Sequence, residues 1–324
     1  MANKINIVQA VQQALQNEMA LDPTVVVYGE DVGVEGGVFR ATVGLQQEFG
    51  KERAFDTPLA ESAIVGSAIG MAINGMKPVV EIQFMGFIYP AVNQIVSHAA
   101  RYRNRTRGLR HLPMVIRAPY GGGIRALEHH SESTEALFAH IPGLKVVIPS
   151  TPYDTKGLLI AAIRDPDPVL FLEPKRIYRA FRQDVPEEAY TLPIGKAKVL
   201  QEGDDVTVVT WGAMVPDVQK AVSGIEELSI EVIDLRTISP MDRETIIESV
   251  EKTGRILVVH EAAKSFGAGA EIIAVVNEKA FLSLEAPPMR LTGFDTTFPL
   301  PRGEEHYIPS PERIRHKIRE LAAY

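Results

Sequence analysis

The sequence contains no cysteine and only one tryptophan in 324 residues. Without cysteine the chain forms neither a disulfide nor a thiolate metal site, and it has no thiol nucleophile. Any redox chemistry must therefore come from a cofactor. No uninterrupted apolar run approaches the roughly 20 residues that cross a bilayer, and the residues after Met1 lack a signal-peptide core. These absences predict a cytoplasmic protein that does not enter membranes.

Basic residues are also in the minority. Lys and Arg total 34 against 41 for Asp and Glu, which gives a net charge of −7 and disfavours generic binding to nucleic acid or acidic membranes. One segment is basic despite the acidic composition of the chain. It contains Tyr102 and five arginines, Arg101, Arg103, Arg105, Arg107 and Arg110. It falls at the end of a predicted helix, where cations complement the helix dipole. We interpret it as a solvated or partner-facing surface.

Apolar runs and helical periodicities alternate along the chain, which predicts an α/β fold with a parallel sheet covered on both faces. The expected strands of the first part are 25–28, 78–84, 114–118, 144–148 and 168–173, and its expected helices are 5–20, one from 61, 90–102 and 154–164. The pattern fades over 182–196. A second alternation follows, with strands at 205–211, 229–235 and 255–261 and helices at 216–228, 243–252 and 268–280. We expect two domains, 1–187 and 188–324.

One acidic residue, Glu61, stands at the start of a predicted helix of small and apolar residues. Asp56 or Thr57 is expected to cap this helix, and Pro58 suits its first turn. In that position Glu61 can simply complement the helix dipole, which contributes about 0.3 to 1 kcal/mol. The apolar neighbours within 59–65, however, leave it no polar face. A buried acid of this kind needs a specific partner and is a catalytic candidate.

Two glycines inside the same helix strengthen the second interpretation. Gly66 and Gly70 each cost about 1 kcal/mol relative to alanine in a helix interior. We therefore expect another segment or molecule to approach this helix closely.

A glycine-rich segment, 121–123, follows the expected strand 114–118 and leads to the adjacent His129 and His130. Loops at the carboxyl ends of strands are where open α/β sheets bind ligands. The histidine pair alone is also compatible with a polar loop or a helix entry, and no third ligand at a suitable spacing supports zinc. Glycine lets backbone approach a ligand, and imidazole exchanges protons near neutral pH. This segment is a second candidate site.

A glycine pair in the second part, Gly267 and Gly269, faintly resembles a dinucleotide-binding fingerprint. The third glycine is missing, and prolines at 287–288 break the chain where an acidic ribose-binding residue is expected. The sequence therefore argues against a nicotinamide site.

An ordered set of short motifs resembles one family almost from end to end. The motifs are 56–61, 78–84, 87–90, 129–131, 142–147, 162–165, 234–240 and 258–261. Together they resemble the β subunit of the thiamine-diphosphate-dependent first component of the 2-oxo acid dehydrogenase complexes. The resemblance implies a transketolase-like pyrimidine-binding domain followed by the transketolase C-terminal domain.

The resemblance also implies roles for individual residues. Glu61 matches the glutamate that hydrogen-bonds the aminopyrimidine ring of the cofactor and favours the imino tautomer that generates the ylid. The ylid adds to the 2-oxo carbonyl, carbon dioxide leaves, and the resulting enamine acylates a lipoyl group. Phe87 would lie beside the pyrimidine, with Gln83 and Glu30 as further cofactor-binding residues. His130 would serve substrate binding and proton transfer, with His129 as its companion.

Half of the cofactor site is absent from the sequence. Thiamine enzymes hold magnesium diphosphate with Gly-Asp-Gly and a downstream Asn, and the nearest string here, 203–205, lacks the second glycine. The resemblance therefore implies an α subunit that holds most of the Mg²⁺ site, an α2β2 heterotetramer, and a chain that is inactive alone. The other implied partners are the peripheral-subunit-binding and lipoyl domains of the dihydrolipoyl acyltransferase.

A monovalent cation site, for example for K⁺, is implied as well. Its ligands would be the carbonyls of Met114, Ala162, Ile163 and Asp165, together with Asp167. Asp167 stands where a relative can have Asn, and its full charge predicts an altered ion preference.

Pyruvate is the first candidate substrate, and branched-chain 2-oxo acid and acetoin dehydrogenases are the alternatives. Pocket volume decides between such substrates, and one methylene is worth only about 1 to 3 kcal/mol. An alternative of another class is a non-catalytic docking subunit, because the acidic balance suits a basic peripheral-subunit-binding domain.

Overall fold

The first sheet is built from strands whose side chains are buried on both faces. In the computed structural model, which describes residues 2–324, it has seven strands in the order β12-β6-β7-β5-β4-β2-β3. The strands are β2 (Val25–Gly29), β3 (Ala54–Asp56), β4 (Lys77–Glu81), β5 (Val115–Tyr120), β6 (Lys145–Val147), β7 (Val169–Pro174) and β12 (Thr237–Ser239). All neighbours pair in parallel except β12, which pairs antiparallel with β6. Runs rich in Val, Ile and Leu suit such a doubly covered parallel sheet.

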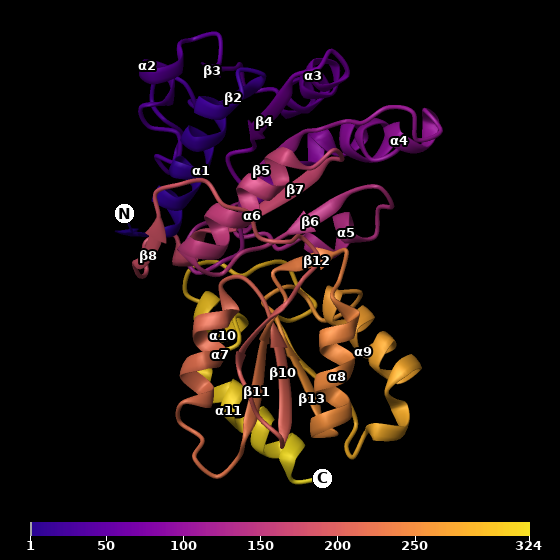
Figure 1. Cartoon of the computed structure of the whole chain (residues 1–324). Coiled ribbons are helices and arrows are strands. Elements are labelled where there is room, and N and C mark those ends of the chain that lie inside the picture. Colours follow the sequence, from indigo (N-terminus) through magenta and orange to yellow (C-terminus); the bar gives the residue numbers. More distant parts are fainter. Residues whose placement is uncertain (1) are drawn as a thin grey trace.

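Helices cover both faces of this sheet (Figure 1). On one face α1 (Ile7–Leu21) packs against α6 (Pro152–Arg164), and Val25 and Val27 of β2 point into this layer. On the other face lie α3 (Glu61–Ile73), α5 (Glu135–Ala139) and the segment 85–105, and Val26 of β2 points toward them. The alternation along β2 follows the period of two of a strand.

The second sheet has five strands in the described part of the chain, in the order β14-β13-β10-β11-β9. They are β9 (Lys198–Gln201), β10 (Val206–Thr210), β11 (Ile230–Asp234), β13 (Ile256–Val259) and β14 (Met289–Leu291), and only β9 runs antiparallel. Figure 1 shows α7 (Met214–Val222), α10 (Glu304–Tyr307) and α11 (Pro311–Ala322) on one side of it, and α8 (Arg243–Thr253) and α9 (Ala268–Lys279) on the other. The predicted α/β class is confirmed in both halves.

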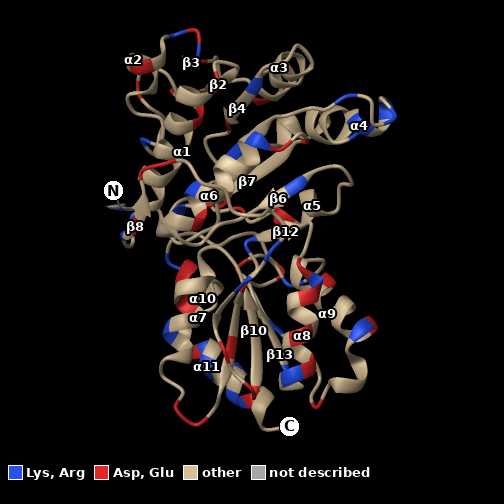
Figure 2. Ribbon diagram, viewed as in Figure 1, with Lys and Arg blue, Asp and Glu red and all other residues tan. Residues whose placement is uncertain are grey.

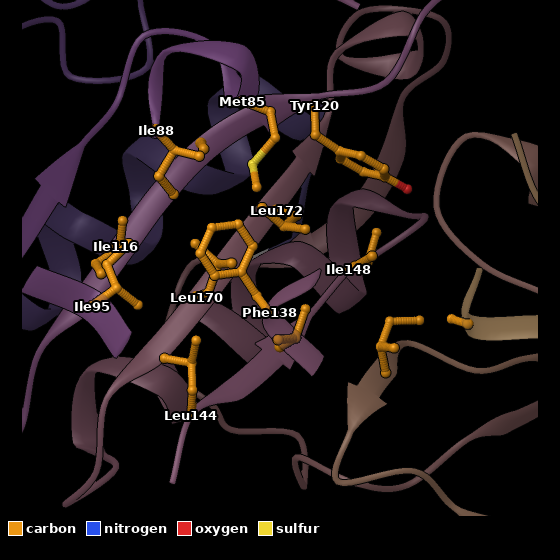
Figure 3. Packing of buried hydrophobic residues seen from close by; sticks show 14 of the residues in the cluster. Met85, Ile88, Ile95, Ile116, Tyr120, Phe138, Leu144, Ile148, Leu170 and Leu172 are labelled. Carbon is orange, nitrogen blue, oxygen red and sulfur yellow. The ribbon is translucent and has the colours of Figure 1, made fainter. Parts of the chain in front are cut away.

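One of the hydrophobic clusters spans both halves. Figure 3 shows Phe138, Leu144 and Ile148 packed against Leu170 and Leu172 of β7. The same cluster continues into the second half through its single tryptophan and the strands β10, β11 and β13. Together with the β12–β6 pairing, this core joins the halves. The boundary at 187 and 188 stays a prediction.

The prediction of one continuous helix over 90–102 is wrong. The chain instead makes 3-10 turns at Met85–Phe87 and Tyr89–Ala91, a π-helix at Gln94–Ala99 and the short helix α4 (Tyr102–Arg105). The π geometry is visible in the bond from the Ala100 amide to the Ile95 carbonyl, 2.9 Å. Such π turns interrupt α-helices most often at functional sites.

The predicted cap of the Glu61 helix is also wrong. Helix α3 begins at Glu61, its N-cap residue is Ala60, and no side chain caps it. The Asp56 carboxylate instead accepts hydrogen bonds from the amides of Gly33 and Val34, at 2.7 and 3.2 Å. A short side chain at a strand end can accept hydrogen bonds either from the first amides of the next helix or from the amides of a neighbouring loop. The sequence did not show which of these amides lie closer to Asp56.

Several elements have no counterpart in the sequence prediction. These are the antiparallel pair β1 (Ala2–Ile5) and β8 (Gln183–Pro186), the small helix α2 (Leu45–Phe49), the edge strands β3, β9, β12 and β14, and the helices α5, α10 and α11. Helix α11 has a clear signal, because Ser310 caps it, Pro311 fills its first turn, and Ile314, Ile318 and Leu321 are buried on one face.

Charges are spread over both halves, and the arginines around α4 form a basic end of the first half (Figure 2). Among residues 2–324, no helix has the length and apolar character needed to cross a membrane.

Candidate active site

The candidate residues lie beyond the carboxyl ends of neighbouring parallel strands. Glu30 follows β2, Gln83 follows β4, and the 121–123 glycines follow β5. Because β2 pairs with β4 and β4 with β5, these strand ends share one edge of the sheet. Ligands bind at this edge in open α/β sheets.

Glu61 opens α3 and is 8 % exposed. Its carboxylate makes no hydrogen bond or ion pair with any other residue in 2–324. Burial raises the pKa of the half-buried Glu30, and the charges of Glu61 and Asp31 raise it further. The Glu61 carboxylate therefore lies close enough to affect the pKa of Glu30, and no cationic side chain is among the groups that shift this pKa. A buried acid without a partner is costly, so this arrangement fits a hydrogen-bond donor supplied by a bound molecule.

The described residues leave the space beside Gly70 open and approach Gly66 with one side chain. A Cβ on Gly70 would meet no described atom within 4 Å, and one on Gly66 would meet only the Gln94 side chain, 3.6 Å away. The close approach that the sequence predicts is therefore made at Gly66 by the Gln94 side chain of the segment 94–99, which packs on α3, and not at Gly70 by any described residue.

His129 and His130 lie on a 3-10 turn, Glu128–His130, that packs against the turn Met85–Phe87. The His130 ring is 4.5 Å from the Phe84 ring and 5.2 Å from the Phe87 ring, both edge to face. The two imidazoles are 4.5 Å apart. The structure thus brings Phe87 and the histidine pair together, as the resemblance implies.

The His130 imidazole is held in a state suited to accepting a proton. Its Nδ1 is buried and has no hydrogen-bond partner among the described residues. Burial lowers the pKa of His130, and the charges of His129 and Lys175 lower it further. The ring is therefore neutral at neutral pH, and a neutral imidazole is a general base.

Two residues around the histidines were missed by the sequence analysis. The Phe84 and His130 rings meet edge to face. Gly86 allows the turn Met85–Phe87 to touch the turn Glu128–His130. A Cβ on Gly86 would overlap the carbonyl of His129. The glycine is visible in the sequence, but only the fold shows what it faces.

Gln83 links two of the loops at the site. Its Nε2 donates to Oδ2 of Asp31 at 3.0 Å. Asp31 has a φ of 58°, in the left-handed region, so the loop after β2 is sharply bent where it carries Glu30.

A buried ion cluster supports the same edge and was also missed. Arg117 of β5 donates to Glu81 at 2.9 Å and to both carboxylate oxygens of Glu173 at 2.6 and 3.0 Å. The hydroxyl of Tyr178 donates to Glu173 at 2.5 Å. Arg117, Glu81 and Glu173 are all buried. Glu81 is the last residue of β4, so the cluster fixes the strand from which Gln83 and Phe84 emerge.

The proposed cation ligands lie where β5, β7 and the end of α6 meet. The Met114 carbonyl accepts from the Val169 amide at 3.0 Å. Lys145 Nζ contacts both oxygens of Asp165 at 2.6 and 2.5 Å, and Arg103 donates to Asp167 at 2.6 Å. Both carboxylates thus already have a protein cation, so K⁺ would depend on the carbonyl oxygens, and those of Met114 and Ala162 also accept a backbone hydrogen bond. Residues 2–324 hold no cluster of three acidic, histidine or cysteine ligands.

Two cavities lie outside the cluster of His130 and Glu61. One of 560 Å³ is bounded by Lys145, Asp165 and the linker 191–194. The other, of 350 Å³, lies between Arg125, Arg176 and the start of α11. The larger cavity borders the domain linker rather than the candidate catalytic residues.

Known proteins match the whole chain. Family models match at residues 3–180, described as the transketolase pyrimidine-binding domain, and at 195–314, described as the transketolase C-terminal domain. A pyruvate dehydrogenase E1 component subunit beta of Acholeplasma laidlawii is 63 % identical over 98 % of both chains. Proteins of the same name from Mycoplasma pneumoniae and Bacillus subtilis are 52 % and 51 % identical, over 98 % and 99 % of this chain and 97 % and 99 % of theirs. This chain belongs to the pyruvate dehydrogenase E1 β-subunit family.

The fold comparison agrees with this membership. A solved chain described as "Split gene transketolase, inactive beta4 tetramer" superposes with a TM-score of 0.78 at 21 % identity, covering 98 % of this chain and 99 % of that chain. The family and the order of its two transketolase-like domains are confirmed. A pyruvate dehydrogenase E1 β subunit is a component of an oxidoreductase complex, and this transketolase-like family uses thiamine diphosphate. The roles of individual residues stay predictions.

Proposed function

We propose that this chain is the catalytic β subunit of a pyruvate dehydrogenase and supplies half of a thiamine diphosphate site that an α subunit completes. The observation that carries the proposal is Glu61, a residue only 8 % exposed at the ligand-binding edge, whose carboxylate has no hydrogen-bond or ion-pair partner among the described residues. An acid placed only for docking or stability would be exposed or paired, because an unpaired buried charge lowers stability.

The residues at this edge fit the pyrimidine half of the cofactor. When bound, thiamine diphosphate supplies the carbon nucleophile and the electron sink for decarboxylation of a 2-oxo acid. Glu61 would accept a hydrogen bond from the pyrimidine ring, and Phe87 would pack beside it. Glu30 and Gln83 would line the same half-site. Burial and the charges of Glu61 and Asp31 raise the pKa of Glu30 at this half-site.

His130 would act on the acyl group after decarboxylation. Its lowered pKa keeps the ring neutral, and the Phe84 and Phe87 rings fix its plane. It can therefore take a proton from the reacting hydroxyl oxygen and deliver a proton to the lipoyl sulfur that is released when the disulfide opens. His129 is half-exposed and faces Glu128, at 3.6 Å, so we give it the lesser role.

The remaining assignments follow from the missing half of the site. Residues 203–205 lie in a turn where the amides of Asp204 and Asp205 bond to the Ser229 carbonyl, which does not resemble a magnesium diphosphate site. An α subunit would hold Mg²⁺ and the diphosphate in a cytoplasmic α2β2 enzyme. The carbonyls of Met114, Ala162, Ile163 and Asp165 would hold K⁺. The acceptor would be a lipoyl domain of the acyltransferase, whose peripheral-subunit-binding domain would dock the enzyme.

His130→Ala is expected to slow acetylation of a lipoyl domain by about 100-fold, since general acid–base catalysis contributes about 10² to 10⁴. Pyruvate decarboxylation with an artificial electron acceptor is expected to fall much less. Both rates are measured on the co-purified αβ enzyme, with pyruvate and a branched-chain 2-oxo acid as substrates. His129→Ala is the matched comparison, and its rate of lipoyl acetylation should fall less than that of His130→Ala. Unchanged lipoyl acetylation in the His130 variant would remove this residue from the mechanism.

A further inference from the structure

The histidine pair lies on a loop, residues 121–133, whose two ends are held together. The Gly121 amide donates to the Glu132 carbonyl at 2.9 Å, so the loop closes at its base. His129 and His130 lie on this closed loop, near its second end. Whatever fixes the base therefore also fixes the histidines.

Glu261 reaches the base of this loop from the second half of the chain. It follows β13 and is 4 % exposed. The Ser133 hydroxyl donates to its Oε1 at 3.4 Å, the Gly122 amide opposes the rise that burial causes in its pKa, and its Oε2 is buried without a hydrogen-bond partner among the described residues. Gly121 lies so close that a Cβ there would overlap the same oxygen. One carboxylate thus touches both ends of the loop.

Lys175 holds the same base from the first half. It follows β7, it is buried, and its ammonium donates to the Gly121 carbonyl. Glu261 and Glu304 supply the opposing charge. A lysine and a glutamate buried for packing alone would be better replaced by apolar side chains, because their desolvation offsets most of the attraction. The contacts of both residues converge on one loop.

We propose that Glu261 and Lys175 are positioning residues that hold the 121–133 loop, and with it His130, at the reaction site across the boundary between the two halves. The proposal deepens the proposed function and rests on it. It gives the second half of the chain a part in catalysis that is separate from any docking role.

The charge of Lys175 also acts on the imidazole. The groups that affect the pKa of His130 are His129 and Lys175, which lower it, and Glu128, which raises it. Phe84 and the turn Met85–Phe87 on its other side present two phenyl rings and no charge. Lys175 therefore helps to keep His130 neutral, an effect that a purely structural lysine would not have.

Lys175→Met is the first test, in the co-purified αβ enzyme. Lipoyl acetylation is expected to fall about 10- to 100-fold, as for other small misplacements of a catalytic group, while decarboxylation with an artificial acceptor changes less than about twofold. Loss of the positive charge raises the pKa of His130, so the acid limb of the acetylation pH profile moves to higher pH. Lys156→Met is the control, because Lys156 is equally buried and bonds to the carbonyls of Pro186 and Glu187, away from the site.

Gly121→Ala tests the contact of the loop with Glu261 and remains informative if the Lys175 variant does not assemble. Gly121 and Gly50 have φ values of 84° and 85°, but a Cβ on Gly50 meets nothing within 4 Å. Gly50→Ala therefore places a side chain at a similar positive φ without the clash. Amide hydrogen exchange of 121–133, measured by mass spectrometry, should accelerate at least about tenfold in Gly121→Ala and Lys175→Met and stay unchanged in both controls.

The outcomes separate this proposal from the one on which it rests. If amide hydrogen exchange of 121–133 is unchanged in Lys175→Met and Gly121→Ala, the positioning role is overturned. It is also overturned if exchange accelerates but lipoyl acetylation stays normal. An unmoved pH profile in Lys175→Met overturns the electrostatic part. An assembled wild-type enzyme that does not decarboxylate pyruvate overturns the proposed function, whereas the exchange measurement still reports on the loop.

Discussion

Glu61→Gln is expected to reduce pyruvate decarboxylation by the assembled enzyme at least about 100-fold, the lower range of general acid–base effects. The amide matches the carboxylate in size but cannot share a proton with the cofactor ring. The same substitution removes a buried charge that has no partner and that acts on Glu30. It should therefore leave the melting temperature unchanged or raise it. Opposite effects on activity and stability are typical of a residue kept for function.

Glu18→Gln is the matched control for this experiment. Glu18 is also a buried helical glutamate, but Arg164 donates to both of its oxygens at 2.8 and 2.7 Å. Glu18→Gln should lower the melting temperature and leave the rate of pyruvate decarboxylation per assembled enzyme unchanged. Full decarboxylation in a well-assembled Glu61→Gln enzyme would show that Glu61 only complements the dipole of α3.

Arg117→Met is expected to produce the largest loss of stability. It leaves the carboxylates of Glu81 and Glu173 buried without their cation, and such a loss costs about 3 to 5 kcal/mol. At about 2 to 4 °C per kcal/mol, the melting temperature should fall by roughly 10 °C. Arg243→Met is the control, because its pair with Glu271 is mostly exposed and should change the melting temperature by less than about 1 °C.

The pH dependence of the Arg117 variant gives a second check. Burial raises the pKa of Glu81 even with Arg117 present. Without the arginine, the folded-state pKa of Glu81 lies further above that of the unfolded chain. The folded state then binds more protons, so the stability of the variant should increase as the pH falls toward the folded-state pKa. A variant that is equally destabilised at all pH values would mean that lost packing, not an unpaired charge, is the cause.

The sequence predicted those parts of the fold that depend on local patterns. Strands such as β2 and β7 are continuous runs of β-branched and apolar residues, and their burial on both faces leaves little choice of structure. Glu61 was identified because an acid among apolar neighbours is visible in a single helix. The domain order came from the family resemblance rather than from periodicity.

Features that depend on long-range pairing were not predictable in this way. Arg117 meets Glu81 only because β4 and β5 pair in register, and Glu173 joins them from β7. Asp56 turned from the helix to the loop amides at Gly33, a choice between two nearby partners. The contacts of Glu261 with the histidine loop span more than a hundred residues of sequence, and no local signal marks them.

The most direct test of the account is pyruvate decarboxylation with thiamine diphosphate and Mg²⁺ by the purified chain alone and by the chain co-purified with its α subunit. The account predicts activity in the pair, a preference for pyruvate over a branched-chain 2-oxo acid, and none in the chain alone. Comparable activity in the chain alone would mean that it holds a complete cofactor site. An inactive but correctly assembled pair would contradict the catalytic role of this subunit.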